Sequence, residues 1–151
     1  MIDNIKKDIL LSEYTTIGLG GYADYFIECN SEEDIINAIS YAKSNKQRYH
    51  ILGGGSNTVF SDNGFKGIVI YINTKGISDD GNGNFIVKAG VEWDTFVEYT
   101  VKKGYSGIEC LSGIPGNTGA APIQNIGAYG QEVSESIVSV KVIDTENMET
   151  I

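Results

Sequence analysis

The sequence has 151 residues, which suits one domain or two small lobes that share a ligand. Its 20 acidic and 11 basic residues give a formal net charge of −9, which argues against a nucleic-acid groove or a surface for anionic membranes, since both need clustered Lys and Arg. Hydrophobic residues make up 41% of the chain, a fraction typical of a globular protein with a real core.

The first half of the chain predicts a compact β-α-β-β lobe over residues 1–73. Residues 22–29 alternate loosely between apolar and polar types and predict a strand. Residues 31–34, Ser-Glu-Glu-Asp, predict a capping box that opens a helix. That helix has one apolar face, formed by Ile35, Ile36, Ile39 and Ala42.

The same lobe continues with two further strands. Residues 49–52 predict a short strand that leads directly into three glycines. Asp62-Asn-Gly64 marks a turn, and residues 67–72 predict a buried strand.

The second lobe is predicted over residues 74–151. Its first element follows a turn at residues 79–84 that is rich in Asp and Gly. Residues 85–89 predict a strand. Trp93, Val97 and Val101 lie on one face of a helix that runs to about Lys103, and Gly104 ends it as the C′ residue. The repeated strand–helix–strand pattern indicates an α+β or mixed α/β architecture.

The last residues predict an incomplete hairpin. Residues 137–143 alternate as a strand, residues 144–147 form a polar turn, and residues 148–151 begin a returning strand. Either the last four residues pair elsewhere or the chain is part of a longer protein, and we favour the second reading. If another chain supplies a missing part, we expect it to pair at residues 144–151.

The glycine turn after residue 52 is a candidate phosphate site. Successive N–H groups in such a turn can form an anion-binding nest, to which Ser56 and Asn57 add side-chain donors. The turn lacks the Gly-Lys-Ser/Thr ending of a P-loop, and no helix signal follows it as in a dinucleotide fingerprint. An ordinary tight turn explains this segment equally well.

Residues 107–130 are the most informative segment. The run is neither helical nor alternating, and it is interrupted by Gly113, Gly116, Gly119, Gly127 and Gly130. Only glycine lets a backbone approach a flat ligand without a Cβ. Ile114-Pro-Gly116 predicts a turn with positive φ at Gly116, and Thr118 is a candidate cap for a short helix. Residues 122–125 bring amide groups that can read a heteroaromatic edge. A structural loop is the alternative, but unstructured loops of this length are usually functional. Together with the glycine turn, the run predicts one elongated ligand held at two points.

Several single residues have simpler readings. The two cysteines, Cys29 and Cys110, match no metal-ligand spacing, and we expect reduced thiols and no metal site. His50 is expected to be a satisfied structural histidine, and Glu109 to cap local N–H groups. Trp93 is expected to anchor its helix in the core. Tyr129 is expected either to stack on a ring or to fill the core.

The N-terminal residues lack the apolar region of a signal peptide, and no apolar run approaches the roughly 20 residues of a membrane span. We therefore expect a cytoplasmic protein.

Four motifs carry a resemblance to a known family. They are residues 15–24 (Thr-Thr-Ile-Gly-Leu-Gly-Gly-Tyr-Ala-Asp), 52–57 (Leu-Gly-Gly-Gly-Ser-Asn), 114–116 (Ile-Pro-Gly) and 122–130 (Pro-Ile-Gln-Asn-Ile-Gly-Ala-Tyr-Gly). In this order they resemble the flavin-binding part of the UDP-N-acetylenolpyruvoylglucosamine reductase family, which acts second in bacterial peptidoglycan precursor synthesis. The triple-glycine motif is shared more widely among flavoproteins.

The resemblance implies an α+β, two-lobed FAD-binding fold of the vanillyl-alcohol-oxidase type, with mixed sheets, helices and FAD between the lobes. It implies that residues 53–57 grip the pyrophosphate and that residues from 114 onward pack along the flavin and its ribityl chain. The implied cofactor-binding residues are Gly53, Gly54, Gly55, Ser56, Asn57, Ile114, Pro115, Gly116, Thr118, Gly119, Ala120, Ala121, Ile123, Asn125, Gly127, Ala128 and Tyr129.

In the family that this sequence resembles, NADPH reduces FAD, and the reduced flavin then passes hydride to the enolpyruvyl group of a UDP-sugar. We expect no counterparts of the family's catalytic serine, arginine and glutamate in these 151 residues, because the only arginine is Arg48 and the C-terminal substrate domain is expected to be missing. Cys110 stands where relatives often have Asn. We expect FAD binding, and UDP-sugar binding only when the missing domain is supplied.

Two other functions stay open. A non-catalytic flavin or nucleotide module, or one half of a split flavoenzyme, is the main alternative. A different flavoprotein oxidase on the same fold is the weaker one, since we expect neither a His nor a Cys beside these loops to be poised for covalent flavin attachment.

Overall fold

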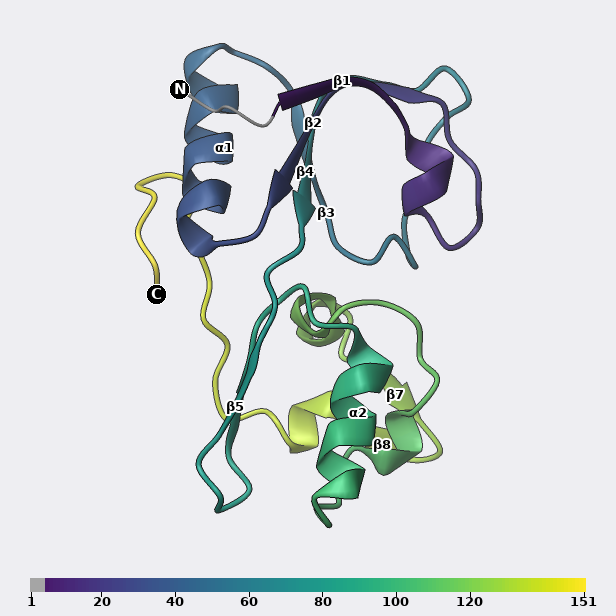
Figure 1. Ribbon diagram of the computed structural model, residues 1–151, viewed down its shortest axis with the longest axis vertical. Coiled ribbons are helices and arrows are strands. Elements are labelled where there is room, and N and C mark those ends of the chain that lie inside the picture. Colours follow the sequence, from purple (N-terminus) through teal and green to yellow (C-terminus); the bar gives the residue numbers. More distant parts are fainter. Residues whose placement is uncertain (1–4) are drawn as a thin grey trace. The chain divides into compact units, whose positions relative to one another are not determined.

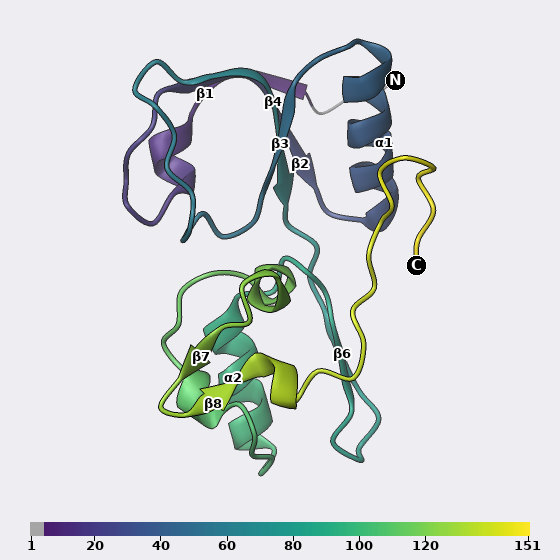
Figure 2. The ribbon, with the colours of Figure 1, turned by 180° about the vertical axis from the view of Figure 1, so that it is seen from behind.

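The computed structural model describes residues 5–151, which divide into two compact units. The first unit comprises the chain up to Thr74 together with Lys141–Ile151, and the second comprises Lys75–Val140. Figures 1 and 2 show the chain coloured along the sequence from opposite sides. Residues 141–151 were predicted in the second lobe, but they pack with the first unit.

The first unit is built on a mixed four-stranded sheet in the order β1-β2-β4-β3. Its strands are β1 (Ile5–Leu10), β2 (Tyr22–Cys29), β3 (Tyr49–Leu52) and β4 (Phe65–Ile72). Both β2 and β3 pair in parallel with β4, whereas β1 pairs antiparallel with β2. The predicted strands β2 and β3 are confirmed with their bounds, and β4 is confirmed with two more residues at its start.

Helix α1 (Glu32–Ser44) covers one face of this sheet, as Figures 1 and 2 show. The predicted capping box is confirmed, because Ser31 Oγ accepts the Asp34 N–H at 3.1 Å and the Asp34 carboxylate accepts the Ser31 N–H at 2.9 Å. Ala38, Ile39 and Ala42 of the helix are buried against apolar side chains of β2 and β4.

The opposite face of the sheet is covered by a short 3₁₀ helix, η1 (Leu11–Tyr14), and by loop residues. Side chains alternate between the two faces of a strand, so Phe26 and Val69 point away from α1. The rings of Tyr14, Phe26 and Tyr71 pack together, with centroids 4.5 Å, 5.4 Å and 5.7 Å apart in the three pairs. This aromatic cluster forms the floor of the candidate site.

The C-terminal residues form a short hairpin that packs on α1. Val142 and Ile151 exchange two backbone hydrogen bonds of 2.9 Å, and Ile143 bridges Thr150, so the predicted returning strand pairs within the chain. Glu32 of α1 accepts hydrogen bonds from Lys141 at 2.7 Å and from Thr150 at 2.6 Å. These bonds fasten the hairpin to the first unit.

The predicted strand over residues 137–143 is wrong over most of its length. Only Ile143 takes part in a bridge, and no strand among residues 5–151 pairs with residues 137–141. Strand conformation needs a neighbour that satisfies the backbone N–H and C=O groups, and an alternating pattern alone does not supply one.

The second unit combines two short hairpins with a helix and 3₁₀ turns. The elements are β5 (Ile77–Asp79), β6 (Phe85–Val87), α2 (Trp93–Lys102), η2 (Glu109–Leu111), η3 (Thr118–Ile123), β7 (Gly127–Ala128), β8 (Gln131–Glu132) and η4 (Val133–Glu135). The predicted strand at 85–89 is confirmed, but it ends at Val87. The predicted helix and its end are confirmed, with Gly104 at φ +83°.

The buried face of α2 differs from the prediction at one position. Val101 is 50% exposed, and Thr100 takes its place beside Trp93 and Val97. A helix turns 100° per residue, so Thr100 lies within about 20° of Trp93, whereas Val101 lies about 80° away. The predicted core role of Trp93 is confirmed, and its Nε1 donates to the Leu111 carbonyl at 2.9 Å.

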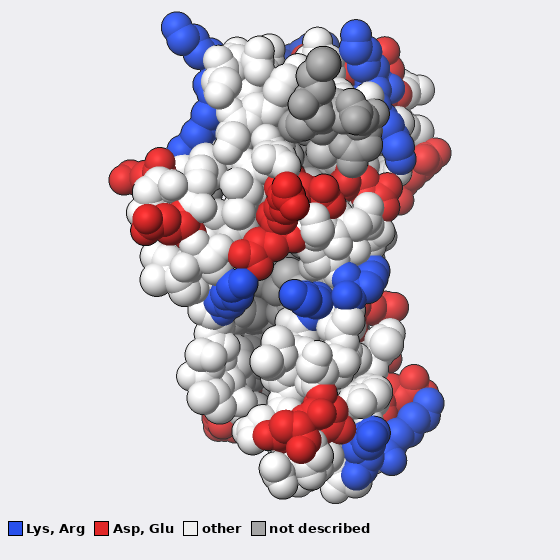
Figure 3. Space-filling view, turned by 60° about the vertical axis from the view of Figure 1, so that its left-hand side comes forward, with Lys and Arg blue, Asp and Glu red and all other residues white. Residues whose placement is uncertain are grey.

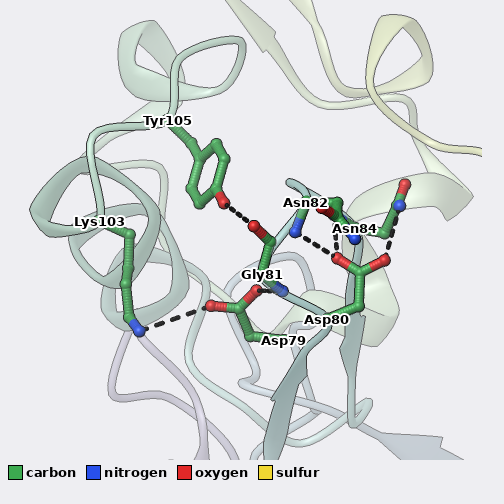
Figure 4. A network of polar contacts seen from close by, with 7 residues as sticks. All are labelled: Asp79, Asp80, Gly81, Asn82, Asn84, Lys103 and Tyr105. Atoms are coloured by element: carbon green, nitrogen blue, oxygen red, sulfur yellow. Dashed lines mark hydrogen bonds and ion pairs between the residues drawn. The ribbon is translucent and has the colours of Figure 1, made fainter.

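The turn between β5 and β6 is held by carboxylate-to-backbone hydrogen bonds (Figure 4). Asp80 accepts the N–H groups of Asn82 at 2.8 Å and Asn84 at 3.2 Å, as well as the Asn84 side-chain amide at 2.9 Å. These bonds lower the pKa of Asp80, with the Asn84 side chain as the largest cause. The Tyr105 hydroxyl also donates to the Gly81 carbonyl at 3.1 Å, so the turn is tied to the segment that follows α2.

Candidate functional site

The glycine turn, residues 53–57, follows β3 at the carboxyl ends of the parallel strands, where α/β proteins commonly bind ligands. Gly55 has φ +68°, and a Cβ there would lie 2.0 Å from the Tyr14 carbonyl oxygen. Thr16 donates its N–H to the Gly55 carbonyl at 3.0 Å. Glycine is therefore required at residue 55, because the backbone of Tyr14 and Thr15 lies directly against it.

A cavity of about 310 Å³ opens beside this turn, entirely within the first unit. It is lined by Glu13, Tyr14, Thr15, Thr16, Gly54 and Tyr71. This lining includes no Lys or Arg, so an anion there depends on backbone N–H groups. On the face drawn in Figure 3, several acidic side chains lie together in a band, and basic side chains lie in smaller groups.

Sequence reasoning missed most of this lining. Of the six residues only Gly54 was among the expected cofactor-binding residues. Thr15 and Thr16 belong to the first motif of the resemblance, which was the one signal available for them. Tyr71 lies within a strand predicted from hydrophobicity alone. Burial raises the pKa of the Tyr71 hydroxyl, and the charges of Glu28 and Tyr14 raise it further.

The first motif forms a loop fastened to its surroundings by hydrogen bonds. The buried Thr15 donates its hydroxyl to the Leu19 carbonyl at 2.9 Å, and the Gly18 N–H returns to the Thr15 carbonyl at 3.0 Å. Gly21 donates its N–H to the Ser61 carbonyl at 2.9 Å. These contacts fix residues 14–16 beside the glycine turn.

The remaining expected site residues lie in the second unit. Gly116 has the predicted positive φ, +122°, and its carbonyl accepts the Trp93 N–H at 2.9 Å. The predicted cap at Thr118 is wrong. Asn117 holds the N-cap position of η3 without a side-chain cap, and Thr118 donates both its hydroxyl (3.0 Å) and its N–H (2.8 Å) to the Val91 carbonyl. Thr118 is the first residue of η3 and does not hold its N-cap position, and its hydroxyl donates to another segment.

The small residues of η3 are explained by packing within the second unit. Gly119 donates its N–H to the Ala89 carbonyl at 2.9 Å, and a Cβ on Gly119 would lie 2.5 Å from the Ala89 Cβ. Ala121 is buried in the core of the unit, Ile114 and Ala128 pack partly against that core, and Ala120 is half-buried. Their contact with a cofactor remains a prediction.

Two apolar side chains of this group project into solvent. Ile123 is 84% exposed, and Tyr129 is 93% exposed at φ +52°. The reading of Tyr129 as core filler is therefore wrong, whereas stacking on a ring remains a prediction. Asn125 is occupied locally, since its Nδ2 donates to Glu132 at 2.6 Å and its Oδ1 accepts the Ser134 N–H at 3.0 Å. Of the others, Pro115 and Gly127 are exposed, the latter in β7.

The predicted role of Glu109 is confirmed. Its carboxylate accepts the Gly107 N–H, and this bond is the main cause that lowers the pKa of Glu109. Cys29 and Cys110 are free thiols, and burial raises the pKa of Cys29 to about 12, which keeps it protonated. Within residues 5–151 no group of three His, Cys, Asp or Glu side chains could hold a metal ion, and no helix there is both long and apolar enough to cross a membrane.

The expectation of a satisfied His50 is wrong. Its Nε2 is buried and has no hydrogen-bond partner among the described residues, while its ring packs edge-on to Phe60 at 5.2 Å and near Phe65 at 6.1 Å. Burial lowers the pKa of this imidazole below its usual value of 6.5. The apolar packing that favours the neutral ring also removes possible partners.

This environment makes the stability of the first unit depend on pH. The folded state binds the His50 proton less well than the unfolded state, so the free energy of unfolding should fall as pH drops below about 6.5 towards the lower folded pKa. Above pH 6.5 the effect should be absent. Urea unfolding of the wild type and His50→Phe between pH 5.0 and 7.5 measures it. The variant should show a clearly smaller slope, and equal slopes would contradict the prediction.

Comparison with known proteins identifies relatives over nearly the whole chain. A family model described as an FAD binding domain matches residues 23–149. The UDP-N-acetylenolpyruvoylglucosamine reductase of Salinispora arenicola (strain CNS-205) is 46% identical over 138 residues, which cover 89% of this chain and 38% of that protein. That of Thermobifida fusca (strain YX) is 43% identical over 148 residues, covering 95% of this chain and 42% of that protein. The chain thus spans about two fifths of the length of these relatives.

Solved structures of two flavoenzymes are also similar to this chain. The crystal structure of UDP-N-acetylenolpyruvylglucosamine reductase from Thermus caldophilus superposes with a TM-score of 0.80 at 28% identity, covering 98% of this chain and 52% of that one. 6-Hydroxy-D-nicotine oxidase from Arthrobacter nicotinovorans has a TM-score of 0.67 at 20% identity, covering 85% and 29%, and shares the fold alone. The resemblance read from the four motifs and the expected fold class are both confirmed.

Proposed function

The chain belongs to the FAD binding domain family, and on that premise we propose that it is the FAD-binding part of a UDP-N-acetylenolpyruvoylglucosamine reductase. The observation that carries the proposal is the identity of 46% and 43% to two reductases of this name, spread over nearly the whole chain. In this proposal the two units are the two FAD-binding lobes.

The residues of the first unit fit a dinucleotide cofactor. A cavity of about 310 Å³ is large enough for part of such a ligand and lies beside a glycine turn at the carboxyl ends of parallel strands. The turn offers backbone N–H groups where the cavity lining carries no positive side chain, and N–H nests of this kind bind phosphate. Residues 53–57 would thus hold the pyrophosphate of FAD.

In the second unit, two exposed side chains fit contact with the flavin ring. Ile123 and Tyr129 are large and almost fully exposed, so both side chains are available to pack against a ligand. A flat isoalloxazine ring is a suitable partner for both. The two side chains would exclude water from one side of the ring and fix its orientation.

When bound, FAD supplies hydride transfer, and the protein supplies binding, orientation and electrostatics. We propose NADPH as hydride donor and the enolpyruvyl UDP-sugar as acceptor, on the basis of the relatives' names and the family resemblance. No catalytic residue is assigned within this chain. A cytoplasmic location likewise remains a prediction.

Replacing Ile123 and Tyr129 separates cofactor binding from folding. Ile123→Ser and Tyr129→Ser should each weaken FAD binding about tenfold, because each removes apolar contact with the ring. Both side chains are exposed, so the free energy of unfolding should change by less than about 0.5 kcal/mol. Titration of flavin fluorescence and urea unfolding measure the two quantities. The control is Ile86→Ser, an exposed residue of β6 at 73%, which should leave FAD affinity unchanged.

The proposal itself is tested by the visible absorption spectrum of the purified chain after addition of FAD and gel filtration. Retention of a flavin spectrum with about one FAD per chain is expected. A colourless protein with no measurable FAD affinity would refute the proposed cofactor role. Reduction by NADPH, with and without the enolpyruvyl UDP-sugar, then distinguishes a reductase part from a non-catalytic flavin module.

A further inference from the structure

The chain contains two Asn-Gly pairs, Asn63–Gly64 and Asn82–Gly83. Such a pair can modify itself, because the backbone nitrogen of the glycine can attack the amide carbon of the asparagine side chain. Glycine favours the attack, since it has no Cβ to obstruct the approach. Both asparagines are exposed to solvent, so the surroundings of the two glycine nitrogens decide which pair reacts.

The first pair is held firmly within the first unit. Gly64 donates its N–H to the Ser61 carbonyl at 2.8 Å. A Cβ on Gly64 would lie 1.9 Å from the Tyr22 carbonyl oxygen, so the backbone of β2 lies directly against this glycine. The attack on Asn63 would require Gly64 to leave both contacts, and that needs local opening of the turn.

The second pair lies in the turn between β5 and β6, entirely within the second unit (Figure 4). The Asp80 carboxylate accepts the N–H groups of Asn82 at 2.8 Å and Asn84 at 3.2 Å. These bonds hold the residues on both sides of Gly83, whose own N–H has no hydrogen-bond partner among the described residues. The attacking nitrogen therefore has no such bond to give up.

We propose that Asn82 is a site of spontaneous deamidation in the folded protein and that its conversion weakens the turn between β5 and β6. The Gly83 nitrogen loses its proton to hydroxide and attacks Cγ of Asn82, which closes a succinimide ring. The bond from Cγ to Nδ2 breaks, and this nitrogen takes a proton from water and leaves as ammonia. Water then opens the ring at either carbonyl and gives aspartate or isoaspartate.

The conversion acts against the hydrogen bonds of Asp80. The Asn84 side-chain amide is the largest cause that lowers the pKa of Asp80, and the N–H and side chain of Asn82 contribute to the same shift. A carboxylate at residue 82 cannot donate a hydrogen bond, and its charge repels that of Asp80. Isoaspartate also lengthens the backbone between the two amides that Asp80 holds. The reaction needs no cofactor, so it is independent of the proposed function.

The test incubates the folded chain at neutral and at mildly alkaline pH and analyses its proteolytic peptides. Mass spectrometry detects the replacement of an amide NH₂ by OH and assigns it to a residue, and chromatography separates aspartate from isoaspartate. Asn82 should convert at least about tenfold faster than Asn63, because Asn63 reacts only after local opening. The rate at Asn82 should rise in proportion to hydroxide concentration. No conversion of Asn82, or conversion of Asn63 at an equal or higher rate, overturns the proposal.

The unfolded chain is the control for the role of structure. In guanidinium chloride both pairs lose their contacts, so the rates at Asn63 and Asn82 should converge. A difference that persists in the unfolded chain would show that sequence neighbours select the site, which contradicts the structural argument.

Two variants test the site and its consequence. Asn82→Ser should abolish conversion in the peptide that contains the turn and leave the rate at Asn63 unchanged. Undiminished conversion of that peptide would assign the reaction to Asn84 and refute the proposed site. Asn82→Asp should unfold at a lower urea concentration than Asn82→Ser, because only the former adds a charge beside Asp80. Equal midpoints would refute the proposed weakening of the turn.

Discussion

Replacing Gly55 with alanine should lower the free energy of unfolding of the first unit by about 3 kcal/mol. The positive φ of +68° costs an L-residue about 1 kcal/mol. The new Cβ would lie 2.0 Å from the Tyr14 carbonyl oxygen, and displacing this backbone adds an overpacking cost of about 2 kcal/mol. Since Tyr14–Thr16 line the cavity, FAD affinity should also fall at least tenfold. Urea unfolding and flavin titration measure these effects.

Gly18→Ala is the matched control, because it isolates the cost of backbone conformation. Gly18 has φ +69°, almost the same as Gly55, but a Cβ there would meet nothing within 4 Å. Its substitution should cost only about 1 kcal/mol. If the two variants lose equal stability, the close approach of Tyr14 to the turn does not determine the requirement for glycine.

Elements whose signal is local could be predicted from the sequence. The capping box at Ser31 specifies the start of α1 through two hydrogen bonds between residues three apart, and both are present. Strand β2 follows from loose alternation of apolar and polar residues, and β4 follows from a short apolar run. Strand β1, Ile-Lys-Lys-Asp-Ile-Leu, gave no clear signal, because an edge strand can be rich in charged residues.

Features that depend on distant residues were the ones that sequence reasoning missed. Residues 137–141 continue the predicted strand pattern but pair with no strand of the described chain, and pairing is not encoded in the pattern itself. Tyr71 of β4 and Tyr14, which lies 57 residues earlier in the chain, both line the cavity. No local sequence motif predicts that they lie together. His50 was expected to be satisfied, but its neighbours Phe60 and Phe65 offer no acceptor.

The glycines show why a motif alone could not assign the site. Gly55 and Gly119 are required by contacts of the chain with itself, to the Tyr14 carbonyl and to Ala89 respectively. A Gly-rich run is therefore explained by close backbone packing before any ligand is considered. What distinguishes the glycine turn is the cavity beside it, and what distinguishes the second segment is the exposure of Ile123 and Tyr129.

The second large effect is expected at the floor of the cavity. Phe26 is fully buried, and its ring packs against Tyr14 at 4.5 Å and Tyr71 at 5.7 Å, both of which line the cavity. Phe26→Ala should lower the free energy of unfolding by about 3–5 kcal/mol, through lost burial and the void left behind. Domains of this size have total stabilities of about 5–15 kcal/mol, so the variant should be only marginally folded.

A graded series separates packing from cavity shape. Phe26→Leu retains most of the apolar volume and should cost about 1.5 kcal/mol, yet it removes the flat surface on which the two tyrosines rest. FAD affinity should therefore fall about tenfold in this variant under conditions where it is fully folded. Tyr22→Ala, on the same strand but 57% exposed, should cost less than about 1 kcal/mol and leave affinity unchanged. Wild-type FAD affinity in a folded Phe26→Leu protein would show that the aromatic cluster supports the fold without shaping the site.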